Sequence, residues 1–531
     1  MDRDGIRRYL SPRRQSILTL VGVTIVASLL RLYTLGKRSL WIDEGSSVAI
    51  AGSRLPHLVH LLWLGESNMA LYYVTLHFWL GWGRSEFAMR SLSVTFAVAT
   101  IPLIYALGCE LLNPRVALAA SLMLAVNADH IEFAQDARGY AMVVFLCAAA
   151  TYYLVRGLRD GGLRNWSLYV IAMTLAGYTH LLAMLELAAH VVGLVWLRPG
   201  RHAIKSFAGA FILAALLWIP LVLFAVFRNS GQLAWVPPPS VYAIGHVFYL
   251  VSGDLFRRNG TAVVFAGLLA LALGGVIAQW GSTRARALGF LWTLVLTPLT
   301  VLLFISHWQP MLVDRYLLFC MPAALLLGAA GLSELRNRSV VTVYFALLMV
   351  LLLRSDLDYY RYFRGGDWRD TAQYVLAEGR PGDAVILFPD ETRWSFDYYY
   401  QSQMHRTQSP RVVFPNWDSF YRINGVYAGG CDAIGPSSTT LVSLPANYRR
   451  VWLVLSHDGL RKPRRAPESR FLQLSLAREY GPPVERDFVG IRVLLYAHPQ
   501  LPPPKSRHIV VMASGHRPTA TLPASGGHRA L

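Results

Sequence analysis

Two adjacent carboxylates, Asp43 and Glu44, follow soon after the first long apolar run of the chain. Acidic residues beside a membrane segment face a cavity or water more often than acyl chains, because charge next to lipid is costly. Transfer of a sugar needs a base that deprotonates the acceptor, and negative charge near the developing oxocarbenium ion favours it. Adjacent carboxylates on a turn point in different directions, so one can act while the other orients the loop. The pair is therefore a candidate catalytic site, and a solvated loop start is the alternative.

Two arginines at the starts of apolar segments are further candidates. Arg138 lies in the run 135–140, and Arg315 follows Asp314. A guanidinium group binds phosphate through paired hydrogen bonds, so both are candidate contacts for a donor phosphate. The alternatives are an arginine that snorkels at a helix end and mutual neutralisation of Asp314 and Arg315. Five other side chains are candidates for lining the same site, with a solvated or interfacial role as the alternative: Tyr140, His180, Asp136, Glu66 and Tyr72.

The elements that must position these residues are membrane helices. Of the 531 residues, 54% are hydrophobic and only 15% are charged, a composition that few soluble globular proteins have. Several stretches of roughly 18 or more residues are nearly free of charge, which is long enough to cross a hydrocarbon core. These runs are continuous rather than alternating, which favours helices over strands. The sequence therefore predicts a polytopic α-helical membrane protein.

We expect about eleven spans joined mostly by short loops. The basic start of the chain and the arginines of alternate loops place the N-terminus and those loops in the cytoplasm. Acids and histidines gather in the opposite set of loops, as an external site built from several loops requires. The expected spans are about 16–34, 87–108, 115–127, 139–156, 166–180, 181–197, 206–227, 261–280, 287–305, 316–332 and 339–354. The basic inner connections carry Arg115; Arg156, Arg159 and Arg164; Arg198, Arg201 and Lys205; Arg284 and Arg286; and Arg336 and Arg338.

The composition changes after about residue 356, and no later stretch is long and apolar enough to span. A helix is predicted at 368–378, and strands are predicted at 384–388, 451–455 and 491–495. The predicted organisation is a transmembrane domain at 1–355 with a first outer loop at about 36–86, and a small extracytoplasmic α/β domain at 356–498. Residues 499–531 are rich in Pro, Ser, Gly and His, and we expect them to be disordered.

Other features of the composition exclude some classes of function. The net charge of +19 is spread over many short loops without a basic and aromatic platform, so a nucleic-acid partner is not predicted. The four cysteines have neither metal-site nor disulfide-framework spacing: they are Cys109, Cys147, Cys320 and Cys431. The sequence therefore points to no particular cofactor, and it leaves a divalent cation open.

Six runs occur in a recognisable order: SLWIDE (39–44), LYYVTLHFW (71–79), SEFAMRSLS (85–93), QDARGY (135–140), YTH (178–180) and DRYLL (314–318). In this order they resemble the bacterial branch of the protein O-mannosyltransferase-like membrane glycosyltransferases, which have the GT-C fold. Aminoarabinose transferases of lipid A are relatives of this branch. The resemblance covers about 20–330 and extends much less clearly to the outer domain.

The resemblance implies an enzyme of the plasma (inner) membrane that uses a polyprenyl-phosphate sugar at the outer leaflet. The catalytic Asp of the family maps onto Asp43, and its acidic neighbour maps onto Glu44. The arginine between the third and fourth spans maps onto Arg138, as a phosphate contact. Family members often carry Pro-Pro before the Leu-Tyr-Tyr run, where this chain has Asn68-Met69-Ala70 (68–70). This departure bears on the shape of the first loop and on the choice of acceptor.

The leading hypothesis is an inverting glycosyltransferase for the cell envelope. It would move a hexosyl or pentosyl group from the lipid-phosphate sugar to a glycan, lipid or protein acceptor, with Asp43 as general base. The lipid phosphate is the leaving group, so no nucleotide-binding metal motif is needed. The alternatives are a transporter of lipids or oligosaccharides, an O-antigen ligase-like envelope enzyme and a non-catalytic scaffold. A transporter favours acids in mid-span and repeat symmetry, whereas the charges here gather at the outer rim.

Overall fold

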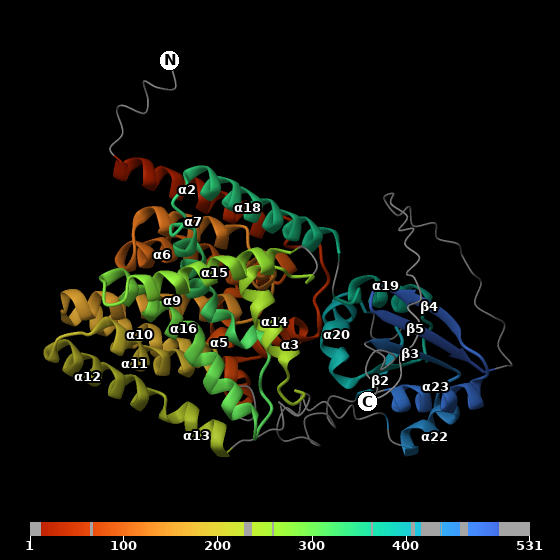
Figure 1. Cartoon of the computed structure of the whole chain (residues 1–531). Helices are drawn as coiled ribbons and strands as arrows, with labels where there is room; N and C mark the ends of the chain where they lie inside the picture. The colour runs from red at the N-terminus through yellow and green to blue at the C-terminus, as the bar shows by residue number, and fades with distance from the viewer. Residues whose placement is uncertain are drawn as a thin grey trace.

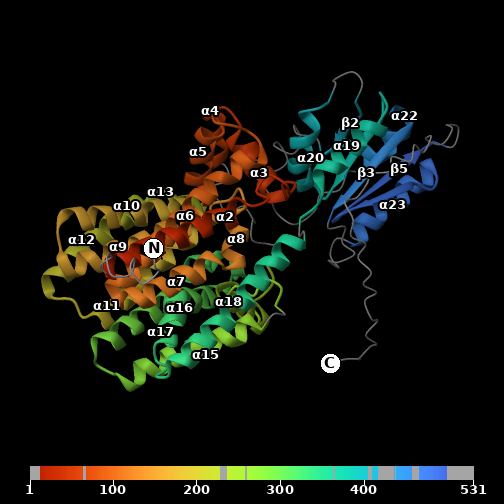
Figure 2. The same ribbon diagram turned by 90° about the horizontal axis from the view of Figure 1, so that it is seen from above.

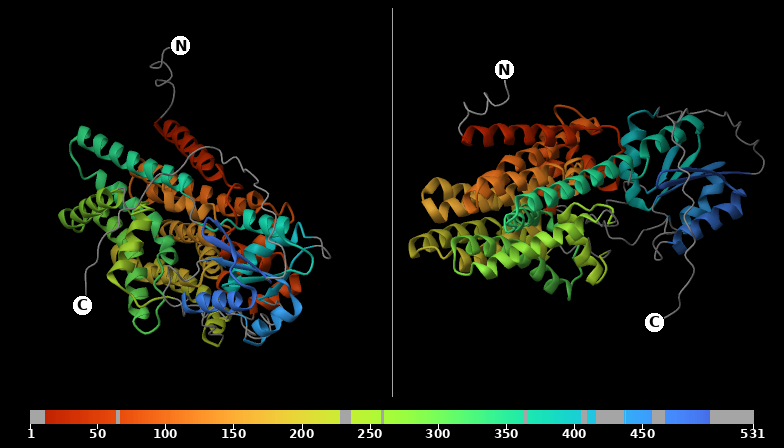
Figure 3. Two further views of the ribbon diagram at one scale, coloured as in Figure 1. Left: turned by 90° about the vertical axis from the view of Figure 1, so that its right-hand side faces the viewer. Right: turned by 45° about the horizontal axis from the view of Figure 1, so that its top comes forward.

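The structure is a computed structural model that describes residues 12–63, 67–227, 236–257, 260–362, 365–404, 409–415, 436, 438–456 and 466–498. It consists of a bundle of helices and a small domain built on a β-sheet, joined through α18 (Figures 1 and 3). The predicted site residue Glu66, the cysteine Cys431 and the predicted disordered tail 499–531 lie outside the described residues.

The helical part contains α2 (Pro12–Leu32), α3 (Ile42–Ala51), α4 (Leu55–Leu61), η2 (Ser67–Met69), α5 (Ala70–Trp79), α6 (Glu86–Leu111), α7 (Pro114–Ala125), α8 (Ala128–Ala134), α9 (Tyr140–Asp160), α10 (Leu163–Thr179), η3 (Leu181–Ala183), α11 (Met184–Leu197), α12 (Arg201–Leu217), α13 (Ile219–Phe227), α14 (Val241–Ser252), α15 (Thr261–Ala278), α16 (Thr283–Ser306), η4 (Asp314–Cys320), α17 (Met321–Leu332) and α18 (Arg338–Arg361). The expected helix in the first outer loop corresponds to α5. Sequence reasoning did not predict α3, α4, α8 or α14.

The number of spans differs from the prediction of about eleven. Seven helical segments of the described chain are long and apolar enough to cross a membrane, or nine if each of two bent pairs forms one span. The bent pairs are α7–α8, at 61°, and α12–α13, at 46°. A helix lies at each of the eleven predicted places, but α10 has only 17 residues and η3–α11 is equally short. Both fall below the length of about 20 residues that a straight span needs, so a multi-pass membrane protein is confirmed but eleven spans are not.

The basic connections lie together at one end of the bundle. Arg156 and Arg159 pair with Glu110, and Arg284 pairs with Glu334. These contacts join four of the helix connections that the sequence predicted to be cytoplasmic. The opposite end carries α3, α4 and α5, which stand between the bundle and the sheet domain (Figure 2).

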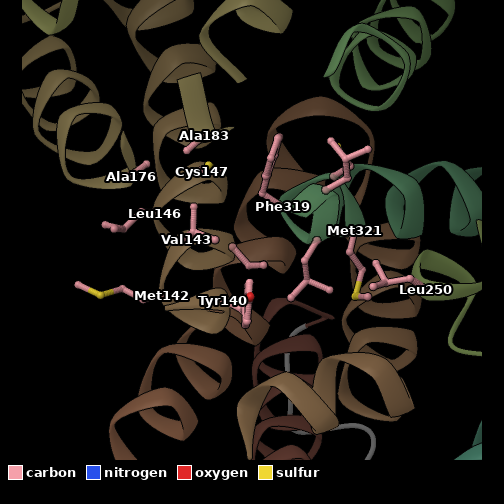
Figure 4. Packing of buried hydrophobic residues seen from close by; sticks show 14 of the residues in the cluster. Tyr140, Met142, Val143, Leu146, Cys147, Ala176, Ala183, Leu250, Phe319 and Met321 are labelled. Carbon is pink, nitrogen blue, oxygen red and sulfur yellow. The ribbon is translucent and has the colours of Figure 1, made fainter. Parts of the chain in front are cut away.

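Close helix packing holds the bundle together. Tyr140 of α9 and Phe319 of η4 belong to one large cluster of buried residues (Figure 4). Where α6, α7 and α17 meet, a Cβ on Gly108 would lie 2.8 Å from side-chain atoms of Ala117 and Leu326. Small residues allow such close approach in lipid, where packing and not water exclusion drives helix association.

The sheet domain has five strands in the order β2-β1-β3-β5-β4. Strands β1, β2 and β3 are parallel to one another, and β5 and β4 complete the sheet in antiparallel fashion. Helices cover both faces of the sheet. Strands β1 and β3 are therefore buried on both sides, which is why their sequences are continuously apolar. The elements are α19 (Trp368–Glu378), β1 (Ala384–Phe388), η5 (Asp390–Thr392), α20 (Arg393–Gln401), β2 (Arg411–Phe414), α22 (Ser438–Asn447), β3 (Arg450–Ser456), α23 (Ala466–Tyr480), β4 (Val484–Phe488) and β5 (Ile491–Ala497).

The predicted helix and three strands of this domain correspond to α19, β1, β3 and β5. The edge strands β2 and β4 were missed for different reasons. Strand β4 is mostly polar and exposed, whereas the apolar run of β2, Val412-Val413-Phe414, is short and followed directly by Pro415. Helix α18 continues to Arg361, past the domain boundary that the sequence placed at 356.

Candidate active site

The acidic pair lies in the first turn of α3, not in a loop as the sequence suggested. The carboxylate of Glu44 accepts a hydrogen bond from the backbone N–H of Trp41, 3.2 Å away, and so caps the start of the helix. Negative side chains are favourable at this position because the helix dipole is positive there. The sequence Trp-Ile-Asp-Glu therefore begins a helix, and the cap gives Asp43 and Glu44 different surroundings.

Glu44 is buried in an ion pair with Arg90 of α6. Two guanidinium nitrogens of Arg90 donate to the two carboxylate oxygens, each at 2.7 Å, and the two side chains are only 2% and 4% exposed. Arg90 also donates to the backbone carbonyls of Leu35, Arg38 and Ser39, at 2.9 to 3.1 Å. One arginine therefore holds the segment that precedes α3. Sequence reasoning missed Arg90, although an arginine in an apolar segment signals a partner.

Glu44 also reaches the segment between α8 and α9. Its Oε1 atom accepts a hydrogen bond from the backbone N–H of Ala137 at 2.9 Å. Three segments far apart in the sequence therefore meet at one carboxylate, whose oxygens are all occupied by donors. The carboxylate of Glu44 therefore joins these three segments and is closed to solvent, whereas that of Asp43 is not.

Asp43 remains partly accessible, with a side chain that is 31% exposed. Its Oδ2 atom lies 4.0 Å from Nη2 of Arg315. Arg138 extends toward the same place and donates to the hydroxyls of Tyr73, at 3.2 Å, and Ser47, at 3.4 Å. The structure thus brings together three residues that the sequence proposed separately.

The guanidinium group of Arg138 can accept a further partner. Nε of Arg138 is buried and has no hydrogen-bond partner among the described residues. The positive charges of Arg138 and Arg315 lie close enough to repel one another, and Asp43 attracts both. A bound anion would therefore be favoured here, because it would pair with both guanidinium groups and use the free N–H.

Asp136 lies beside these groups and is buried. Its carboxylate accepts a hydrogen bond from the indole N–H of Trp41 at 3.1 Å. Burial, followed by the negative charge of Glu44, raises the pKa of Asp136 well above its usual range, although Arg138 opposes the shift. Asp136 therefore keeps its proton to higher pH than an exposed aspartate does.

The other predicted lining residues have supporting positions. The ring of His180 lies between those of Tyr140 and Tyr316, with centroids at 6.1 and 5.0 Å. His180 is buried and accepts a hydrogen bond from the N–H of Leu182, which is the role of a helix cap. Tyr72 is fully buried, and its hydroxyl is hydrogen-bonded to that of Ser93 in α6.

A cavity of about 340 Å³ opens next to the acidic pair. It lies between the segment before α3, helix α8, helix α14 and the start of η4. Its walls carry both acidic and basic side chains. Arg315 lines the cavity and also lies beside Asp43. Lining residues from these elements include Arg38, Trp41, Glu132, Asp136, Tyr249, Asp254 and Arg315. Among the residues that the structure describes, no group of three or more His, Cys, Asp or Glu side chains is placed to hold a metal ion.

The sheet domain packs directly on this region. Arg369 of α19 pairs with Glu86 at 2.5 Å, and the hydroxyl of Tyr399 both donates to Glu86 and accepts from the N–H of Leu40. On the other face of α3, a Cβ on Gly45 would lie 2.6 Å from the backbone of α20. The position of α3, and with it of Asp43, therefore depends on the sheet domain.

Comparisons with known proteins agree with this architecture. Residues 66–228 match the family model described as dolichyl-phosphate-mannose-protein mannosyltransferase. The fold resembles ArnT from Cupriavidus metallidurans in the apo state, with a TM-score of 0.61 and 13% identity over 91% of this chain and 98% of that one. The same protein bound to undecaprenyl phosphate gives a TM-score of 0.57 and 13% identity over 90% and 97% of the chains.

A further similar structure is the oligosaccharyltransferase AglB from Archaeoglobus fulgidus, in complex with an inhibitory peptide and a dolichol-phosphate. Its TM-score is 0.53, with 11% identity over 92% of this chain and 75% of that one. A search of curated protein sequences gives no match. The structural comparisons confirm the resemblance inferred from the six motifs: the chain has the GT-C membrane fold that it shares with these glycosyltransferases.

Proposed function

We propose that the protein transfers a sugar from a polyprenyl-phosphate donor to an acceptor at the outer face of the membrane, with Asp43 as general base. The observation that carries this proposal is the convergence of one accessible carboxylate and two arginines, Arg138 and Arg315, beside a polar cavity. The complexes of ArnT and AglB with polyprenyl phosphates support the class of donor.

In the proposed step, the carboxylate of Asp43 takes the proton from the acceptor group. The acceptor atom then forms a bond to the anomeric carbon, and the bond from that carbon to the phosphate oxygen breaks. The electron pair of the broken bond stays on the phosphate oxygen, so the lipid leaves as a phosphate monoester. Attack from the side opposite the phosphate inverts the anomeric centre.

The arginines would act on the leaving group. The donor phosphate is a diester with one negative charge, and the departing monoester carries up to two. Hydrogen-bond donors that are already in place where negative charge develops stabilise the transition state more than the ground state. Nε of Arg138 has no partner in the part of the chain that the structure describes, and a second guanidinium group, that of Arg315, is close enough to share the site, so the pair suits this growing charge.

The placement of the site on the outer face rests on the basic connections at the other end of the bundle. Arginine and lysine concentrate in cytoplasmic loops. Arg156, Arg159 and Arg284 are held together at the end far from Asp43. Asp43, the cavity and the sheet domain would then all be extracytoplasmic.

The test is turnover of defined donors by purified protein. Wild type and Asp43→Asn are incubated with a panel of polyprenyl-phosphate pentoses and hexoses, and the release of polyprenyl phosphate is measured. We expect the wild type to consume at least one donor and the variant to bind that donor but to consume it much more slowly. Movement of intact lipid-linked sugar across liposomes, without consumption of any donor, would instead support the transporter alternative.

A further inference from the structure

A second basic hollow lies at the end of the bundle that is remote from Asp43. Its volume is about 340 Å³, and it lies between the ends of α6, α9 and α11 and the start of α16. Its walls are part aliphatic and part cationic. Its lining residues include Glu110, Leu158, Leu197, Arg198, Thr283 and Arg286.

This hollow is separate from the active site. Arg90, which holds Glu44, and Glu110 lie on the same helix, α6 (Glu86–Leu111). They are 20 positions apart in the sequence, and a helix rises about 1.5 Å per residue, so the two places are roughly 30 Å apart. This distance is close to the thickness of a hydrocarbon core. The hollow therefore opens at the opposite membrane surface.

The positive charge of the hollow exceeds the negative charge that the described residues place beside it. Glu110, the one acid in its wall, is already paired with Arg156 and Arg159. Arg198 and Arg286 form no ion pair with a carboxylate in the part of the chain that the structure describes. Nη2 of Arg286 donates to the hydroxyl of Thr283, whereas its Nε is buried without a hydrogen-bond partner in that part of the chain.

Two backbone features add to this preference for an anion. Helix α16 has 24 residues, and the positive end of its dipole lies at its start, near Thr283. The first turn of this helix contains no acid that would offset the dipole. Arg198 ends α11 in the left-handed conformation, with φ 49° and ψ 53°, which is strained for a residue with a side chain. Strained residues of this kind occur at ligand clamps, and here the strained residue is one of the unpaired cations.

We propose that the hollow binds an anionic phospholipid from the leaflet opposite the active site. The lipid phosphate would pair with Arg198 and Arg286, and the aliphatic wall around Leu158 and Leu197 would contact the start of an acyl chain. Basic pockets between membrane helices recognise acidic headgroups in this way. Neither the active-site residues nor the donor takes part in this binding.

The test compares the full-length protein with two double variants in detergent. Arg198→Gln/Arg286→Gln removes the unpaired charges of the hollow. Arg336→Gln/Arg338→Gln removes the same charge from another predicted inner connection that does not line the hollow. Binding is measured from the rise in melting temperature as phosphatidylglycerol, phosphatidylcholine or inorganic phosphate is titrated.

We expect wild type and the Arg336/Arg338 variant to bind phosphatidylglycerol in preference to phosphatidylcholine. The Arg198/Arg286 variant should bind phosphatidylglycerol roughly thirtyfold more weakly, which corresponds to about 2 kcal/mol at 1.4 kcal/mol per tenfold. Equal weakening in both variants would show attraction to surface charge in general and would overturn the proposal. Unchanged binding in the Arg198/Arg286 variant, or equal stabilisation by inorganic phosphate, would also overturn it. The readout does not depend on sugar transfer, so it stands or fails separately from the proposed activity.

Discussion

Replacing Glu44 by glutamine tests whether its ion pair with Arg90 holds Asp43 in place. Glutamine has nearly the same shape, but it is neutral and one of its two terminal groups is a donor. Each carboxylate oxygen of Glu44 now accepts from two donors: Oε1 from Arg90 and Ala137, and Oε2 from Arg90 and Trp41. In either orientation the new NH₂ group would therefore face two other donors.

The expected cost follows from the burial of the pair. Both side chains are nearly inaccessible, and removal of one member of a buried ion pair costs about 3–5 kcal/mol, because the other charge stays buried without compensation. Total stabilities are typically about 5–15 kcal/mol, so the loss would be a large fraction of the whole. Glu44→Gln should unfold at a clearly lower temperature than wild type.

Activity should fall in the same variant, although Asp43 is intact. The carboxylate of Glu44 joins α3 to the segment that carries Arg138, so its loss would let the base and the phosphate contact move apart. Misplacement by about 1 Å can cost 10²-fold in rate. The effect on the structure distinguishes this variant from Asp43→Asn, which should lose activity at an unchanged melting temperature.

The assay is thermal unfolding of the purified protein, followed by donor turnover below the transition. Arg90→Gln is the matched control and should destabilise by a similar amount. The double variant Glu44→Gln/Arg90→Gln should cost less than the sum of the single changes, because it leaves no unpaired charge. If Glu44→Gln unfolds at the wild-type temperature, or if the two changes are additive, the argument that this pair holds the site is wrong.

The remaining predictions concern single residues of the site. Asp43→Asn should lower the rate of donor turnover by about 10²–10⁴-fold, and full activity would remove this residue from the mechanism. Arg138→Lys keeps the charge but loses the planar fork, so the KM for the donor should rise, whereas an unchanged KM would indicate a snorkelling side chain. Gly45→Val should lower both the melting temperature and the rate, because a Cβ there meets α20; wild-type values would show that the sheet domain does not position α3. Burial raises the pKa of Asp136, so its ionisation destabilises the folded state. Below about pH 4, where an unfolded aspartate is protonated too, Asp136→Asn should therefore melt at the wild-type temperature. As the pH rises from there toward the folded pKa, the melting temperature of the variant should increasingly exceed that of wild type. A difference that does not grow with pH would contradict this assignment.

The sequence by itself determined the fold class and the positions of the main elements. Apolar runs mark membrane helices because uncharged residues are required in lipid, and helices lie at all eleven predicted places. Buried strands are visible for the same reason, since both of their faces are apolar, whereas the edge strand β4 is polar and exposed and the apolar run of β2 is too short to mark a strand. The 17 residues of α10 are fewer than the roughly 20 that a straight span needs, so the length of this helix does not decide whether it crosses the membrane.

The sequence also located the acidic pair and Arg138, but it did not assign their roles. Adjacent residues of a helix point about 100° apart, and only the surrounding segments decide which one is buried. Glu44 meets Arg90, 46 residues away, and Ala137, 93 residues away, and such contacts leave no periodic pattern in the chain. Tertiary packing therefore decided that Glu44 is buried against Arg90 at the start of α3, that Tyr72 and His180 are buried as well, and that Asp43 remains partly accessible beside Arg315.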